Sequence, residues 1–370
     1  MILKDAFERF VKAHPVAVMA RALMERALEP EALDALFRTH AKRQYEKELL
    51  FSTLVDVMAV VVCGKHPSVR QAYAAMHEQI PVSLTALYAK IDLTRVDAPP
   101  PYDVLIDRIS HDVPSYQPVL KVAHLAGTRV VNNPFWRIAD DKAIGTALAK
   151  ALGVAVPKTW ILPSKAHGDD VSSESLHNLR YPLSWEEMAR EAGFPMYVKP
   201  HWGGGFRDVT RVASMEELLR AYDRSGRLTL IAQESIEWSS YVRCVCVGKA
   251  DVLVLPWDPR LPHHLRYTGA RESMPALSEG LVARCAAEAE TLCRALGYDM
   301  NTVEFAIRDG VPYAIDFMNC APDADLHSVG EENFRWIVTE MAETLVERAF
   351  HPAPWEPTGS WPKALGLAPR

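Results

Sequence analysis

The sequence has little that is suited to a membrane. Its start shows no short basic stretch followed by an apolar core, so we expect no signal peptide. The longest apolar run, residues 49–64, is shorter than a membrane span and contains Asp56. This run predicts a buried helix. We therefore expect a cytoplasmic protein without a membrane partner.

Cysteine and basic charge are also scarce. Of the six cysteines, Cys244 and Cys246 lie two apart, but no second pair has the spacing of a metal site. This pattern favours reduced thiols over disulfides or a structural zinc. The formal net charge of −6 argues against a general nucleic-acid binder. The contents of 49% apolar and 24% charged residues are typical of a soluble globular protein.

The N-terminal part of the chain predicts helices. Apolar residues recur at intervals of three and four over residues 18–28 and 31–45. Pro30 stands where a helix can begin, and Ser83 can cap a further helix. Three consecutive prolines, residues 99–101, cannot continue a helix and therefore indicate a domain boundary.

Beyond this boundary, strand and helix patterns alternate. Residues 103–133 read as a βαβ unit, and residues 301–319 as a hairpin that turns at Asp309-Gly310. Further helices are expected at 140–153, 278–297 and 334–350, and further strands at 158–163, 196–200, 228–235, 241–248 and 250–256.

A strand that contains a lysine is followed by three glycines. Lys199 interrupts an apolar run, and Gly203, Gly204 and Gly205 follow it after three residues. Taken alone, Lys199 could be a strand lysine that reaches water, and the glycines could form a plain turn. Together they are typical of a loop whose backbone amides approach a phosphate.

From about Asp103 to Phe350, the order of these motifs resembles the ATP-grasp superfamily. The resemblance implies an α+β fold in which two α+β subdomains clamp ATP, preceded by a partial α/β pre-grasp unit and an all-helical N-terminal segment. The expected boundaries are 1–97 for the helical segment, 98–135 for the pre-grasp unit, 136–352 for the ATP-grasp domain and 353–370 for a proline-rich tail.

The resemblance also implies residues that bind the nucleotide. Lys142 and Lys199 would contact the phosphates, and the three glycines would form a lid over them. Gln233, Glu234 and the backbone of Ile236 would read the adenine edge. The family's ribose carboxylate falls at Ser240, so either Glu237 substitutes for it or the ribose grip is weak.

The hairpin would carry the metal site. Glu304, Asp316 and Asn319 supply the oxygen atoms that Mg²⁺ or Mn²⁺ prefers. The family separates its last two ligands by one residue, whereas two residues lie between Asp316 and Asn319. In a regular strand these two side chains would point to opposite faces. Either a bulge restores the geometry or Asn319 is not a ligand.

Arginines near the hairpin are candidates for the catalytic charges. Arg243, Arg260 and Arg266 could each hold the γ-phosphate or the acceptor carboxylate, because the guanidinium group binds such oxyanions with two parallel hydrogen bonds. A solvated loop is an equal alternative for any one of them. His111 and Asp112 are weaker candidates for the acceptor site.

The implied activity is that of a ligase. ATP would phosphorylate a small-molecule carboxylate, and an amine or a thiol would displace the phosphate; a homo-oligomer is compatible with this. Residues 103–118, 130–136, 258–267 and 319–336 resemble more narrowly a bacterial group described as glutathione-synthase-like. That resemblance identifies no substrate. A nucleotide-binding protein without turnover is the alternative.

Residues 1–95 resemble the N-terminal region of an insertion-sequence DDE transposase, which suggests a gene fusion; the alternative is a genuine helical cap that only looks similar. A third alternative is therefore a transposase-derived protein that binds DNA or another partner. Through Asp97 the chain carries thirteen Lys and Arg against twelve Asp and Glu, so charge does not support DNA binding.

Overall fold

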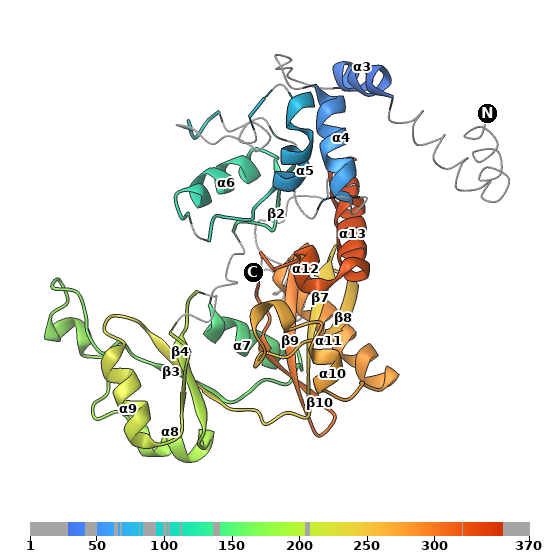
Figure 1. The fold of residues 1–370 in the computed structure, drawn as a ribbon. Coiled ribbons are helices and arrows are strands. Elements are labelled where there is room, and N and C mark those ends of the chain that lie inside the picture. The colour runs from blue at the N-terminus through green and yellow to red at the C-terminus, as the bar shows by residue number, and fades with distance from the viewer. Residues whose placement is uncertain are drawn as a thin grey trace. The chain divides into compact units, whose positions relative to one another are not determined.

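The computed structural model describes residues 29–40, 50–62, 66, 69–80, 82–83, 94–98, 102, 104–111, 113–135, 141–203, 208–319 and 321–350. The chain divides into two compact units, Met1–Leu93 and Thr94–Arg370. The predicted α+β fold class is confirmed: the described residues of the first unit form helices, and those of the second include three sheets (Figure 1). Among the described residues, no helix has both the length and the apolar character needed to cross a bilayer.

The described part of the first unit consists of helices. They are α3 (Pro30–His40), α4 (Phe51–Val62), α5 (Val69–Met76) and the short η1 (His77–Gln79). The buried carboxylate of Asp34 accepts hydrogen bonds from the backbone amide and the hydroxyl of Ser52, both at 2.9 Å. This contact fixes α3 against the start of α4. Pro30 begins a helix as predicted, whereas the helices expected at 18–28 and after Ser83 lie outside the described residues.

The second unit begins with the predicted βαβ unit. Strands β1 (Val104–Ile106) and β2 (Arg129–Val131) pair in parallel, and α6 (Tyr116–Leu125) connects them. Parallel strands need such a crossover because a tight turn cannot return the chain to the same end.

The first large sheet is antiparallel and has four strands in the order β3-β6-β4-β5. Helices α8 (Trp185–Ala192) and α9 (Met215–Arg224) pack against one of its faces, where Met196, Val198 and Ala232 are buried (Figure 1). The strands are β3 (Thr159–Leu162), β4 (Met196–Pro200), β5 (Thr210–Val212) and β6 (Leu230–Glu234).

The second large sheet is also four-stranded and antiparallel, in the order β10-β9-β7-β8. Helices α7 (Lys142–Ala151) and α11 (Glu279–Leu296) contribute Ala149 and Leu292 to its core. Asp309-Gly310 forms the predicted turn, with positive φ at both residues. The strands are β7 (Ser240–Val247), β8 (Asp251–Pro256), β9 (Met300–Arg308) and β10 (Val311–Asp316), followed by α12 (Leu326–Val329) and α13 (Glu331–Phe350).

Strand β5 of the first sheet and the two helices that cover this sheet, α8 and α9, were not predicted from sequence. Helix α9 is only ten residues long and half of its residues are charged, so its apolar stripe is short. Its start nevertheless resembles a capping box: the Ser214 hydroxyl accepts from the Glu217 amide, and the Glu217 carboxylate accepts from the amide of Ala213, one residue before the N-cap. That local signal could have located the helix.

Candidate functional site

Lys199 and Gln233 share one face of the first sheet. Lys199 pairs with Ile231 across β4 and β6, and Tyr197 pairs with Gln233. Since Met196 and Val198 point into the helix-covered core, these side chains point to the opposite face. Tyr197 is 37% exposed, so part of this face is open to a ligand.

The side chain of Lys199 is buried near charges from the second sheet and from α7. Burial lowers the pKa of Lys199; Asp316 and Glu304 oppose this shift, and Lys142 adds to it. Within the described part of the chain, no hydrogen bond or ion pair reaches this ammonium group. A buried lysine without a direct partner is rare, and its position between two subdomains suits an anionic ligand.

Lys142 lies at the first turn of α7 and contacts the start of the glycine segment. Its ammonium group donates to the Gly203 carbonyl, and its amide donates to the His201 carbonyl at 2.8 Å. Asp141 caps α7 by accepting from the amides of Ala143 and Ile144. Gly203 has a φ of 95°, which favours glycine; Gly204 and Gly205 lie outside the described residues.

The predicted adenine-reading residues lie where the chain passes from β6 to β7. Gln233 is buried, and its side-chain amide donates to the Thr159 hydroxyl at 3.2 Å. Glu234 is engaged elsewhere, because its carboxylate accepts from Arg308 at 3.0 Å and from the Lys158 amide at 3.2 Å.

The next positions along this segment differ in accessibility. Ile236 is buried and Glu237 is exposed. Ser240, where the family places its ribose carboxylate, is buried at the start of β7. Of these, Glu237 has the more accessible side chain for a ribose contact.

Glu304 and Asp316 are direct neighbours on the hairpin. Asp316 pairs with Glu304 across β9 and β10, and the register shifts between Ala314 and Asp316. A bulge is therefore present, but it precedes Asp316. Because β10 ends at Asp316, strand alternation does not decide where Asn319 points; its amide oxygen accepts from the Ala321 amide at 3.3 Å.

The donor set fits a hard cation such as Mg²⁺. Two carboxylates face each other on the hairpin, and the amide oxygen of Asn319 follows in the next loop. In the described ranges, no group of three or more His, Cys, Asp or Glu side chains is arranged to hold a metal. Further ligands would have to be amide, phosphate or water oxygens.

Glu304 is held by two side chains of β7. The Tyr241 hydroxyl donates to Glu304 Oε2 at 3.1 Å, and Arg243 Nε lies 3.5 Å from Oε1. Burial raises the pKa of Glu304 to about 7; Arg243 opposes this shift and Asp316 adds to it. Tyr241 was not singled out from the sequence, because one tyrosine in an apolar strand carries no signal by itself.

The three predicted arginines are placed against tryptophan rings. Arg243 and Arg266 each lie 5.4 Å from the ring of Trp257, and Arg260 lies 4.3 Å from the ring of Trp238. Arg243 lies 3.5 Å from Glu304, one of the two candidate metal carboxylates. Its Nη1 also donates to the Tyr267 hydroxyl at 3.0 Å.

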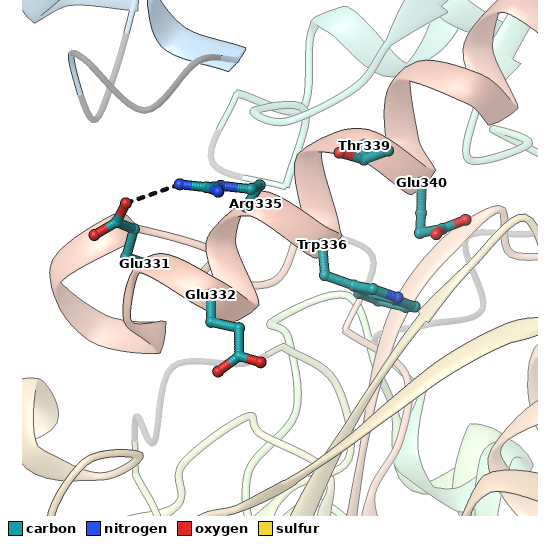
Figure 2. Close-up of a pocket in the computed structure, with 6 residues that line it drawn as sticks. All are labelled: Glu331, Glu332, Arg335, Trp336, Thr339 and Glu340. Carbon is teal, nitrogen blue, oxygen red and sulfur yellow. Dashed lines mark hydrogen bonds and ion pairs between the residues drawn. The ribbon is translucent and has the colours of Figure 1, made fainter. Parts of the chain in front are cut away.

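Two pockets lie along the start of α13. One, of about 530 Å³, is lined by Glu331, Glu332, Arg335, Trp336, Thr339 and Glu340, and Figure 2 shows these side chains on successive turns of the helix. The other, of about 300 Å³, includes Tyr267 and Arg271 in its lining. No predicted site residue lines either pocket, but Tyr267 connects the second pocket to Arg243.

The loop after β1 lies against the loop that follows Asn319. Arg108 donates to the Pro322 carbonyl at 2.8 Å. His111, a predicted acceptor-site residue, is exposed in the same β1 loop, and Asp112 lies outside the described residues. The βαβ unit therefore contacts the region of the candidate metal site.

Comparison with known proteins gives the following likenesses, while no protein-family model matches the chain. D-alanine–D-alanine ligase from Ralstonia nicotianae is 26% identical over 247 residues, which cover 58% of this chain and 72% of that protein. The carbamoyl phosphate synthase large chain from Deinococcus deserti is 25% identical over 193 residues, but these span only 17% of its length.

Among solved structures, D-alanine–D-alanine ligase from Bacillus anthracis complexed with ATP matches 67% of this chain and 78% of its own, with a TM-score of 0.49 and 16% identity. The sequence likeness to these ligases supports the resemblance to the ATP-grasp superfamily. The narrower glutathione-synthase-like resemblance and the transposase resemblance of residues 1–95 stay predictions.

Proposed function

We propose that this chain is an ATP-dependent ligase that activates a small-molecule carboxylate as an acyl phosphate for attack by an amine or a thiol. The main support is the convergence of charges from two subdomains. Lys199 from the first sheet and Lys142 from α7 act on the same region as Glu304 and Asp316 from the second sheet. Cations next to oxygen ligands for a metal suit a triphosphate.

Each group has a distinct part in this reaction. The two lysines bind phosphate oxygens as point charges, and the Gly203 segment covers them. Gln233 and the backbone near Ile236 hold the adenine edge. Glu304 and Asp316, with Asn319 as the third candidate, would hold Mg²⁺, which neutralises negative charge on the transferring phosphoryl group when bound.

The arginines would act at the transferred group. Arg243 is fixed by Glu304 and Tyr267, so its guanidinium is oriented before any ligand arrives. No side chain needs to act as a nucleophile, since the amine or thiol attacks the acyl phosphate directly. Catalysis would consist of positioning and electrostatic stabilisation.

The substrates are proposed from the relatives. D-alanine–D-alanine ligases are named for joining two amino acids, so amino acids head the carboxylate and amine candidates. The test is ADP release from Mg-ATP with D-alanine, other amino acids, small peptides and dicarboxylates added in turn. Stimulated release that is lost in Asp316→Asn supports a ligase. ATP binding without stimulated release for any compound favours the nucleotide-binding alternative.

A further inference from the structure

In the loop after β8, the guanidinium group of Arg260 is bonded along one edge to a carboxylate, and an aromatic ring lies against its face. Asp258 is 1% exposed. Its Oδ1 accepts from Arg260 Nε at 2.9 Å, and its Oδ2 accepts from Arg260 Nη2 at 2.7 Å. The ring of Trp238 lies 4.3 Å from the same guanidinium. We call these three residues the Asp258–Arg260–Trp238 assembly.

The carboxylate of Asp258 is anchored from several directions. It also accepts from the Arg260 amide at 2.9 Å and from the Ser273 hydroxyl at 3.3 Å. The Asp258 amide donates to the Arg266 carbonyl at 2.9 Å. The hydrogen bonds from Arg260 lower the pKa of Asp258, so the carboxylate is charged at neutral pH. Asp258 is thus a fixed carboxylate that holds the arginine side chain in place.

The arginine itself is not enclosed. The side chain of Arg260 is 64% exposed while that of Asp258 is 2% exposed. Nε and Nη2 are committed to Asp258, and no described residue accepts a hydrogen bond from Nη1. If Arg260 served only to neutralise a buried carboxylate, burial of both partners would be expected. Instead most of the Arg260 side chain is exposed while two of its nitrogens are held by Asp258.

The assembly is continuous with the candidate metal site. Trp238 packs edge-on against Tyr241 at 5.4 Å, and the Tyr241 hydroxyl donates to Glu304. Trp238 also lies in the segment that connects the two large sheets, between β6 and β7. Arg260 is therefore oriented relative to both the connecting segment and the hairpin.

We propose that Asp258 and Trp238 are positioning residues that hold Arg260 so that its Nη1 binds an oxyanion of the reaction, either the terminal phosphoryl group of ATP or the carboxylate that receives it. This inference rests on the proposed ligase function. A positive charge at Arg260 is not enough in this proposal. The Asp258 carboxylate and the Trp238 indole must also orient the guanidinium group for it to bind the oxyanion.

The experiment is a double-mutant cycle with Asp258→Asn and Arg260→Ala, read by calorimetric titration of Mg–AMP-PNP and Mg–ADP. Because the lost hydrogen bond joins two charged groups, Arg260→Ala should weaken AMP-PNP relative to ADP by about 10-fold or more. Asp258→Asn should weaken it in the same direction, and the double variant should be no worse than Arg260→Ala. Titration of D-alanine into the ADP-loaded protein tests the carboxylate source in the same way.

Two controls separate binding from folding. Glu290→Gln breaks a comparable 2.7 Å ion pair with Arg294 on α11 and should leave both nucleotide affinities unchanged. Trp238→Phe keeps an aromatic ring without altering the carboxylate, so it tests the assembly if Asp258→Asn unfolds. Thermal unfolding of each variant shows which ones retain the native fold.

The outcomes are distinct. If Arg260→Ala changes neither the AMP-PNP to ADP ratio nor D-alanine binding, Arg260 holds no oxyanion and the inference is wrong. If D-alanine does not bind the wild-type protein, the ratio of AMP-PNP affinity to ADP affinity alone decides whether Arg260 binds an oxyanion. If Arg260→Ala changes the ratio but folded Asp258→Asn and Trp238→Phe do not, the positioning role is wrong. Wild-type protein that binds neither nucleotide contradicts the proposed function itself.

Discussion

The two large sheets prepare their charged residues in opposite ways. In the first sheet, Lys199 is buried and no described side chain bonds to its ammonium group. In the second, Glu304 is buried but held by the Tyr241 hydroxyl and by Arg243. A charge without a partner is costly until a ligand arrives, whereas a charge held on both sides is already in place. The first sheet therefore depends on its ligand more than the second does.

The largest expected effect comes from removing a metal carboxylate. Asp316→Asn keeps the shape of the side chain but deletes a charge from the site that faces Glu304. Loss of an indirect metal contact typically costs 10- to 100-fold in affinity or activity, so loss of a direct ligand should cost more than about 100-fold in Mg²⁺-dependent ADP release. Release at the wild-type rate by the folded variant would show that the hairpin is not the metal site.

The next effect concerns the lysine of the first sheet. Lys199→Ala should weaken binding of a fluorescent ATP analogue by about 10- to 100-fold, since hydrogen bonds to charged groups contribute about 1.5–3 kcal/mol. Lys199→Met keeps the buried apolar part of the side chain and removes the desolvated charge, so this variant should be no less stable than wild type in the free protein. Unchanged affinity would mean that Lys199 does not contact phosphate, and a large loss of stability would mean that it has a partner in the free protein.

These two positions also show how far sequence reasoning reaches. Lys199 was singled out because it interrupts an apolar strand before a glycine run, whereas Glu304 and Asp316 were predicted from the resemblance of the whole motif order, which is a long-range signal. The strands and the Asp309-Gly310 turn follow from local periodicity and turn chemistry. Sequence spacing could not place Asn319, because its position depends on where β10 ends.

Residues that act through tertiary contacts were not found from sequence. Tyr241 and Asp258 have ordinary neighbours in sequence, and their importance comes from Glu304 on a different strand and from the exposed guanidinium of Arg260. The prediction for Glu234 was also incomplete, because it did not include the ion pair that this carboxylate forms. Its partner Arg308 is 74 residues away, so no local pattern reveals that its carboxylate is already engaged.

A smaller effect should follow from removing one of the two groups that hold the Glu304 carboxylate in the free protein. Tyr241→Phe removes the hydroxyl that donates to Glu304 while keeping the ring between Trp238 and Trp257. We expect about a 10-fold loss of Mn²⁺ affinity in the presence of ADP, the lower end for residues that orient a metal ligand. Electron paramagnetic resonance of free Mn²⁺ measures it. The same affinity in both proteins would show that Arg243 alone fixes Glu304.

The smallest effect is expected at the ion pair that joins the two sheets. Glu234 on β6 and Arg308 on β9 meet at 3.0 Å, with side chains 18% and 31% exposed, so the pair should contribute no more than about 1 kcal/mol to the free energy of unfolding. Arg308→Ala should cost at most that amount in urea denaturation.

Glu234→Gln separates structural support from nucleotide recognition. If the Glu234 carboxylate binds only Arg308 and the Lys158 amide, the variant should lose a similarly small amount of stability. Its affinity for the fluorescent ATP analogue should stay within about 3-fold of wild type. That difference is smaller than the 1.4 kcal/mol that corresponds to a tenfold change in affinity. A 10-fold or greater loss of ATP affinity in Glu234→Gln, with no matching loss in Arg308→Ala, would instead assign the carboxylate to adenine. In that case the first sheet, like the second, would hold one of its ligand-binding carboxylates in place before the ligand arrives.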